Sequence, residues 1–101
     1  DPDPEVRKEA VDTLGSFEDT KNLGFLTFIL FHDPDEIVRK EAADELGDIA
    51  HPYSIEALTK ALKDESSIVK KEAIEGLKKI KKKVKAEDQS KGKFSERSYN
   101  K

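Results

Sequence analysis

The feature that most constrains this chain is a short phrase that occurs three times. Residues 1–15 read DPDPEVRKEAVDTLG, residues 33–47 read DPDEIVRKEAADELG, and residues 64–78 read DESSIVKKEAIEGLK. With Val6, Val38 and Val69 aligned, successive copies lie 32 and 31 residues apart (38 − 6 and 69 − 38). A period of this length is typical of stacked helical repeats. We therefore expect an all-α fold, an α-α superhelix of about 2.5 antiparallel helix pairs.

Helical spacing of apolar residues divides the chain further. It predicts helices over about 3–15, 21–31, 35–50, 53–63 and 66–85, in repeats of about 1–32, 33–63 and 64–85. Gly15-Ser16 is expected to end the first helix, and His51-Pro52 marks the break after the third. Since Lys78 replaces the glycine found at Gly15 and Gly47, the last helix should run one or two turns longer. Gly76 lies inside that helix, where it would permit a close helix approach. Residues 86–101 have no period and are expected to be a basic, disordered tail.

The charges are divided unevenly between the two parts of the chain. Residues 1–77 hold 9 Lys and Arg against 19 Asp and Glu, a net charge of −10, and residues 78–101 hold 10 against 3, a net charge of +7. An acidic body with a basic end bears on the choice of partner and not on the fold.

The composition excludes several kinds of site. Without cysteine there is no disulfide framework and no thiolate metal site. His32 and His51 are expected to be solvated loop residues, and no catalytic constellation is evident, so we expect a non-enzymatic protein without a metal or cofactor. The longest apolar run, 23–31, is too short to span a bilayer, and we expect a cytoplasmic protein. Since there is no methionine, we also expect a piece of a longer protein.

The segments VRKEAVDTLG and VRKEAADELG resemble the HEAT-like repeats named after the phycobilisome lyases. The resemblance covers roughly residues 1–82. It implies a stacked-helix fold and a family of binding platforms, bilin lyases and deoxyhypusine hydroxylases. The hydroxylase branch implies His-Glu pairs where this chain has Lys8-Glu9, Lys40-Glu41 and Lys71-Glu72. Lysine does not replace a neutral nitrogen ligand, so we do not carry that activity over.

The resemblance also implies a structural ladder across neighbouring repeats. In such stacks the aspartates of the turns bond to an arginine early in the adjacent helix. The corresponding residues here are Asp1, Asp33 and Asp64, with Arg7, Arg39 and Lys70. Because Lys70 lacks the planar fork of arginine, we expect the third interface to be looser.

The second expected helix is apolar on nearly all sides. Leu26, Leu30 and Phe31 align with apolar residues of the fourth helix and are expected in the core. Phe25, Phe28 and Ile29 align instead with its polar residues. We interpret these three residues either as a partner-docking or self-association surface, or as packing against an upstream repeat or the chain's own tail.

Six lysines gather near the end of the last expected helix: Lys78, Lys79, Lys81, Lys82, Lys83 and Lys85. Their functional interpretation is contact with nucleic-acid phosphates or an acidic protein surface. The structural alternative, which we favour, is the polar cap of a terminal repeat.

The sequence favours a protein-binding scaffold within a larger solenoid or assembly, with a protein partner or homo-oligomer and no membrane. One alternative is a nucleic-acid or ribonucleoprotein-associated subunit that binds through the basic end. Another is a lyase-like subunit that is active only with a partner chain.

Overall fold

The computed structural model describes residues 2–17 and 20–99, and the side chains in these ranges up to residue 87. The helices are α1 (Pro4–Ser16), α2 (Leu23–His32), α3 (Glu36–Ile49), α4 (Ile55–Ala61) and α5 (Ser67–Tyr99), with short 3-10 turns at Thr20–Asn22 and Pro52–Ser54. The described residues contain no strand, so the predicted all-α helical repeat fold is confirmed. None of the described helices is both long and apolar enough to cross a bilayer.

Local chemistry fixes where the helices begin and end. Asp35 caps α3 because its carboxylate accepts hydrogen bonds from the amides of Ile37 and Val38, at 2.8 and 3.3 Å. Ala50 ends α3 in the left-handed conformation, with φ of 55°. Glycine usually occupies a left-handed position at the end of a helix, because a Cβ atom disfavours this backbone conformation.

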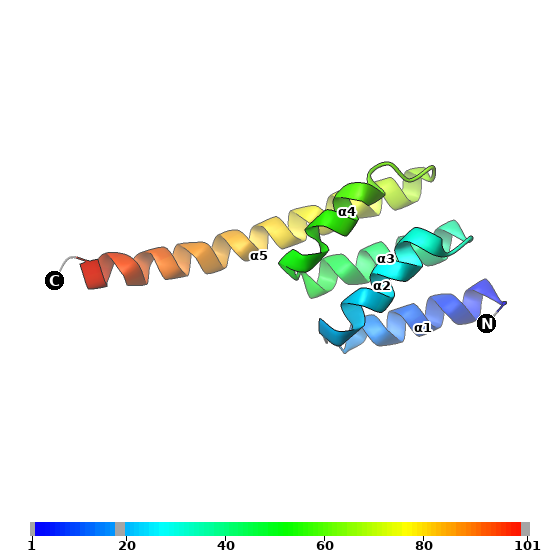
Figure 1. The fold of residues 1–101 in the computed structure, drawn as a ribbon, viewed down its shortest axis with the longest axis horizontal. Helices are drawn as coiled ribbons and strands as arrows, with labels where there is room; N and C mark the ends of the chain where they lie inside the picture. Colours follow the sequence, from blue (N-terminus) through cyan, green and yellow to red (C-terminus); the bar gives the residue numbers. More distant parts are fainter. Residues whose placement is uncertain (1, 18–19, 100–101) are drawn as a thin grey trace.

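The helices form two layers. In Figure 1, α1, α3 and α5 lie side by side in one layer, and α2 and α4 cross over them in the other. The extensive contacts of α2 are with α3 and those of α4 are with α5. The sequence predicts the opposite pairing, α1 with α2 and α3 with α4. The structure differs because only three residues, 33–35, join α2 to α3, and short connections favour antiparallel neighbours.

The core is centred on α3, which packs between α1 and α5. The predicted end of the first helix at Gly15-Ser16 is confirmed, since α1 ends at Ser16, and α3 continues past Gly47 to Ile49, just before the predicted break at His51-Pro52. Gly15 and Gly47 also serve helix packing. A Cβ on Gly47 would lie 2.6 Å from the Cα of Gly76 on α5, so the two helices meet at a pair of glycines. The close approach expected at Gly76 is present.

Two other predictions differ from the structure. Phe31, expected in the core, is 41% exposed, because α2 turns only Leu23, Leu26 and Leu30 fully inward. The helix expected to end near residue 85, before a disordered tail, continues as α5 to Tyr99. No proline follows Pro52, and lysine and glutamate are good helix formers, so no residue in that stretch forces a stop.

Candidate binding surfaces

Equivalent apolar positions of the three copies differ in exposure. Val6 is 45% exposed, whereas Val38 and Val69 are fully buried. One turn later Ala10 is exposed and Ala42 is buried. The difference follows from the layers, since α2 covers α3 and α4 covers α5, but none of the described helices covers α1 in this way. The first copy therefore presents apolar side chains that the same phrase buries elsewhere.

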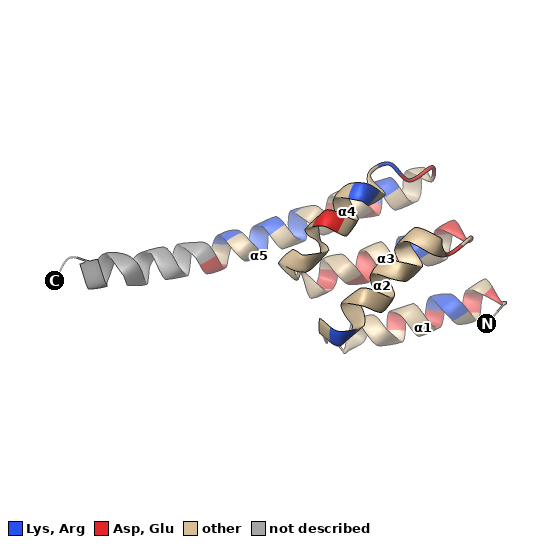
Figure 2. Cartoon of the chain, viewed as in Figure 1, with Lys and Arg blue, Asp and Glu red and all other residues tan. Residues whose placement is uncertain are grey.

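The exposed side of α2 also carries apolar side chains. Thr27 and Phe31 face α4, because they line a groove of about 220 Å³ together with residues of α4. Phe25 and Ile29 each lie two residues earlier, which is about 200° around a helix. They therefore face away from α4, towards the side of the stack where α1 lies. Figure 2 shows that α2 carries no Asp, Glu, Lys or Arg.

The three α2 residues proposed to bind a partner are not equivalent. Phe25 is 46% and Phe28 58% exposed, whereas Ile29 is half-buried and packs against the core. Phe28 also stacks on His32, with ring centroids 4.5 Å apart. Ile29 thus supports the surface from below, and the two phenylalanines form its accessible part. We call Val6, Ala10, Phe25 and Phe28 the open end face.

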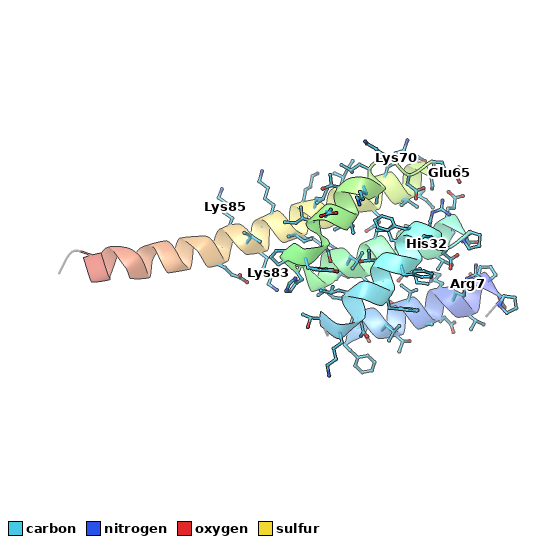
Figure 3. The ribbon with its side chains drawn as sticks, in the orientation of Figure 1. Arg7, His32, Glu65, Lys70, Lys83 and Lys85 are labelled. Atoms are coloured by element: carbon cyan, nitrogen blue, oxygen red, sulfur yellow. The ribbon has the colours of Figure 1, made fainter. Side chains whose placement is uncertain are left out.

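The six lysines do not form one group. Lys79 bonds to Asp48 on α3 at 2.5 Å and lies 3.7 Å from Asp44, and Lys78 lies 3.6 Å from Glu75 within α5. The other four, Lys81, Lys82, Lys83 and Lys85, have no ion pair among the described side chains and are exposed. In Figure 3, Lys83 and Lys85 project from the part of α5 that extends beyond the other helices.

A second groove, of about 570 Å³, lies beside this part of α5. It is lined by the apolar residues Ile55, Leu77 and Val84 together with Lys81 and Lys85. Leu77 is half-buried, and Ile55 and Val84 are partly exposed. The lysines therefore border an apolar strip in addition to extending into solvent.

Two arginine–aspartate contacts of the predicted ladder, which we call rungs, join the repeats. They lie at the end of the stack where Arg7 and Glu65 lie (Figure 3). Arg7 donates two hydrogen bonds to the Asp33 carboxylate, at 2.8 and 3.0 Å. Arg39 donates two to Asp64, both at 3.1 Å, and a third to the Asp33 carbonyl oxygen at 2.9 Å. Lys70 is exposed and has no ion pair among the described residues, and Asp1 lies outside them.

The first rung shifts the pKa of its carboxylate. Burial alone would raise the pKa of Asp33, but the hydrogen bonds from Arg7 and from the Asp35 amide outweigh it. The pKa of Asp33 therefore lies below its usual value, and the Arg7 hydrogen bond raises the pKa of the guanidinium. This rung stabilises the stack at neutral pH.

Three carboxylates meet between α1 and α3, a feature that the sequence interpretation missed. One oxygen each of Asp12, Glu41 and Glu45 lies within 4.8 Å of the others. Glu41 and Glu45 are buried and Asp12 is exposed. The signal was present in the register of the repeats, because stacking one copy on the next brings residue 12 beside residues 41 and 45.

Neither histidine contributes to this cluster. His32 stacks on Phe28, and the Nδ1 atom of His51 accepts a hydrogen bond from the Tyr53 amide at 3.0 Å. Within the described part of the chain, the only group of three or more potential metal ligands is the carboxylate cluster.

Residues 23–89 match a family model described as HEAT repeats, and these residues run from the start of α2 into α5. No curated protein matches the chain significantly.

Proposed function

Because the chain belongs to the HEAT repeat family, we propose that it is a non-enzymatic protein-interaction scaffold whose open end face binds a helix of a partner protein. The observation that carries this proposal is the exposure of Val6, at 45%, where its counterparts Val38 and Val69 are fully buried. Many proteins of this repeat class bind other proteins on such surfaces. The narrower similarity to phycobilisome-lyase-type repeats stays a prediction.

The two covered copies indicate what the partner helix looks like. α2 packs its buried residues Leu23, Leu26 and Leu30 onto α3, and α4 uses Ala57, Leu58 and Ala61 on α5. A helix on α1 would therefore carry small or aliphatic residues three and four positions apart. Phe25 and Phe28 would extend the contact along the side of α2.

The charge of α1 indicates which charge the partner helix should carry. The exposed acidic residues of α1 and its cap are Asp3, Glu5, Glu9 and Asp12, against Arg7 and Lys8. Arg7 is already engaged with Asp33. A partner helix with lysine or arginine beside its apolar stripe is thus favoured electrostatically, and its association should slow as salt rises.

A pair of matched variants tests the proposal. Phe28→Glu places a charge on the open end face, and Thr59→Glu places it at the equivalent, exposed position of α4. Immobilised chains capture partners from an extract of the native cells, and mass spectrometry quantifies them. We expect Phe28→Glu to reduce capture at least about tenfold, since losing an aromatic anchor removes about 1–2 kcal/mol or more of binding free energy. Thr59→Glu should have little effect.

Circular dichroism and thermal melts check that both variants are folded. If Phe28→Glu unfolds the chain, Phe25→Ser provides a milder change on the same face. Equal capture by the folded wild type and the folded Phe28 or Phe25 variants would contradict the proposal.

The rival is a nucleic-acid contact through the basic end of α5. The observation in its favour is that Lys81, Lys82, Lys83 and Lys85 are exposed and have no ion pair among the described side chains. Such binding would weaken steeply with salt and would disappear when these lysines are replaced by glutamine. Nuclease treatment of the extract separates the rival from the proposal, because captured proteins would be lost only if nucleic acid bridged them.

A further inference from the structure

We propose that the side of α5 that faces away from α3 binds the side of α1 that faces away from α3 in a second copy of this chain, so that copies associate head to tail. In Figure 1, α1 and α5 form the two edges of the layer that has α3 at its centre. The contact would repeat the one that α1 makes with α3 and α3 makes with α5. It uses a different side of α1 from the open end face. Because purified chain alone tests it, it can fail while the proposed function holds.

An exposed isoleucine on α5 is the first observation. Val11, Ala43 and Ile74 occupy the same position in the three copies, 32 and 31 residues apart (43 − 11 and 74 − 43). Val11 and Ala43 are 1% and 0% exposed, because α1 packs on α3 and α3 packs on α5. Ile74 is 45% exposed. The third copy thus presents a large apolar side chain at a position that the first two copies bury.

The helix register directs Ile74 away from α3. Gly76 meets Gly47 of α3, and Ile74 lies two residues earlier, which is about 200° around the helix. Lysines one, two and three turns from Ile74 lie on the same side of α5: Lys70, Lys78, Lys81 and Lys85. All four are exposed, and among the described side chains only Lys78 forms an ion pair, with Glu75 at 3.6 Å. This side of α5 therefore has an apolar centre with basic residues around it.

The corresponding side of α1 carries the opposite charge. Gly15 meets Glu45 of α3, so Thr13, two residues earlier, faces away from α3. Glu9 and Glu5 lie one and two turns before Thr13 on that side, and both are exposed. A basic side and an acidic side of the same chain attract each other, whereas each repels its own kind. Charge therefore favours a contact between α5 of one copy and α1 of another.

The register of the existing interfaces indicates which residues would meet. Each copy of the phrase carries an adjacent lysine and glutamate: Lys8-Glu9, Lys40-Glu41 and Lys71-Glu72. Burial raises the pKa of Glu41, and Lys8, across the first interface, opposes that rise. Lys40 opposes in the same way the rise that burial causes in the pKa of Glu72. The same register would place Lys71 of one copy beside Glu9 of the next, and both residues are exposed.

The contact should be weaker than the interfaces within the chain. Gly15 and Gly47 let neighbouring helices approach closely, and the residue at their position in the third copy is Lys78. The aliphatic part of a lysine can lie along a neighbouring helix, but the two backbones then stay further apart. We therefore expect reversible association with a Kd on the order of 0.1 mM. Because the two sides differ, the contact is heterologous, and copies can add one after another.

Sedimentation equilibrium of the purified chain tests the contact. Between about 10 µM and about 1 mM, a range that spans the expected Kd, the average mass should rise with concentration. At the upper end it should exceed the mass of a dimer, since a heterologous contact does not close on itself after two copies. Raising the salt concentration to about 0.5 M should weaken the association, because it screens the attraction between the lysines and the glutamates.

Two matched variants test the apolar centre. Ile74→Glu places a charge in the middle of the contact and should keep the chain monomeric at about 1 mM. Ile37→Glu is the control, because Ile37 is exposed to a similar extent, 42%, and lies on α3, which takes no part in the contact. It should associate as the wild type does. Circular dichroism and thermal melts check that both variants are folded.

A charge exchange tests the register, and it does not depend on the folding of Ile74→Glu. Lys71→Glu alone and Glu9→Lys alone each bring like charges together at the contact, so each should associate at least about threefold more weakly than the wild type. In an equimolar mixture, every contact between unlike copies again pairs opposite charges. The mixture should therefore associate nearly as strongly as the wild type.

Four results would overturn the proposal. One is a wild type that stays monomeric at about 1 mM, which would leave the lysines as the polar cap of a terminal repeat. Another is association that stops at a dimer, which would indicate a surface that pairs with itself. The third is equal association of folded Ile74→Glu and folded Ile37→Glu. The fourth is a mixture of the two charge variants that associates no better than either variant alone.

Discussion

Replacing Glu45 with glutamine should remove a pH dependence from the stability of the fold. Glu45 is 6% exposed, and its pKa rises from an ordinary value of 4.5 to about 8 because it is buried beside Asp12, Glu41 and Asp44. The folded state therefore keeps a proton on Glu45 that the unfolded state releases above pH 4.5. The stability from this proton is fully present below pH 4.5 and is lost as the pH rises through about 8.

The size of the effect follows from the shift. Each pKa unit is worth about 1.4 kcal/mol, so the ceiling is about 5 kcal/mol. Asp12 is exposed and shares the proton, and solvent near it lowers the effect, so we expect the wild type to lose about 1–2 kcal/mol between pH 5 and pH 8 relative to Glu45→Gln. The pKa of Asp33 is lowered, so protonation of Asp33 changes the stability of the fold only at more acidic pH.

Urea unfolding at pH 5, 6.5 and 8 in EDTA measures this difference, with Glu56→Gln as a control on the exposed surface of α4. EDTA removes any bound cation, so the measurement concerns the proton alone. An identical pH dependence of Glu45→Gln and wild-type protein, or a wild type that gains stability relative to the variant as the pH rises, would refute the reasoning.

Four further substitutions test the packing, each by urea unfolding. Arg39→Lys should lower the free energy of unfolding by about 1–3 kcal/mol, because lysine cannot keep the paired hydrogen bonds of the buried guanidinium; an unchanged midpoint would contradict a role for the rung. Gly47→Ala should destabilise by about 1–3 kcal/mol through overlap with the backbone of Gly76, whereas Gly24→Ala, with no atom within 4 Å of the new Cβ, should stabilise by up to about 1 kcal/mol. Ala50→Gly should stabilise by about 0.5–1 kcal/mol by relieving the positive φ, and a loss of stability would show that the Ala50 methyl group matters more.

Much of the architecture could be predicted because the residues that determine it recur in each copy of the repeat. The three valines fix the register of the copies, and the repeated phrase places Arg7 beside Asp33 and Arg39 beside Asp64. These contacts join one copy to the next at a constant offset. A single sequence therefore contains several instances of the same interface, and each supports the others.

The pairing of helices could not be predicted from the apolar stripes. The stripe on α2 is compatible with packing on α1 or on α3, and the choice depends on the geometry of the three-residue connection before α3. Phe31 was placed wrongly for a related reason, since its alignment with Leu62 was correct but both residues are partly exposed, at 41% and 36%.

The carboxylate cluster was missed because its members belong to different copies. Within one copy, Asp12, Glu41 and Glu45 look like solvated charges of helices. Only the lateral packing of α1 on α3 buries Glu41 and Glu45 and brings Asp12 to them. The pattern of charge within a single helix does not contain that information.

The most direct test of the account compares the three copies of the repeated phrase in solution. Hydroxyl-radical labelling, read by mass spectrometry, measures the accessibility of individual side chains in the free chain and in the chain captured with its partner. We predict that Val6, Phe25 and Phe28 are labelled in the free chain and protected in the complex, while Val38 and Val69 stay unlabelled in both. Strong protection of Val6 in the free chain, or unchanged labelling of all three exposed residues in the complex, would contradict the account.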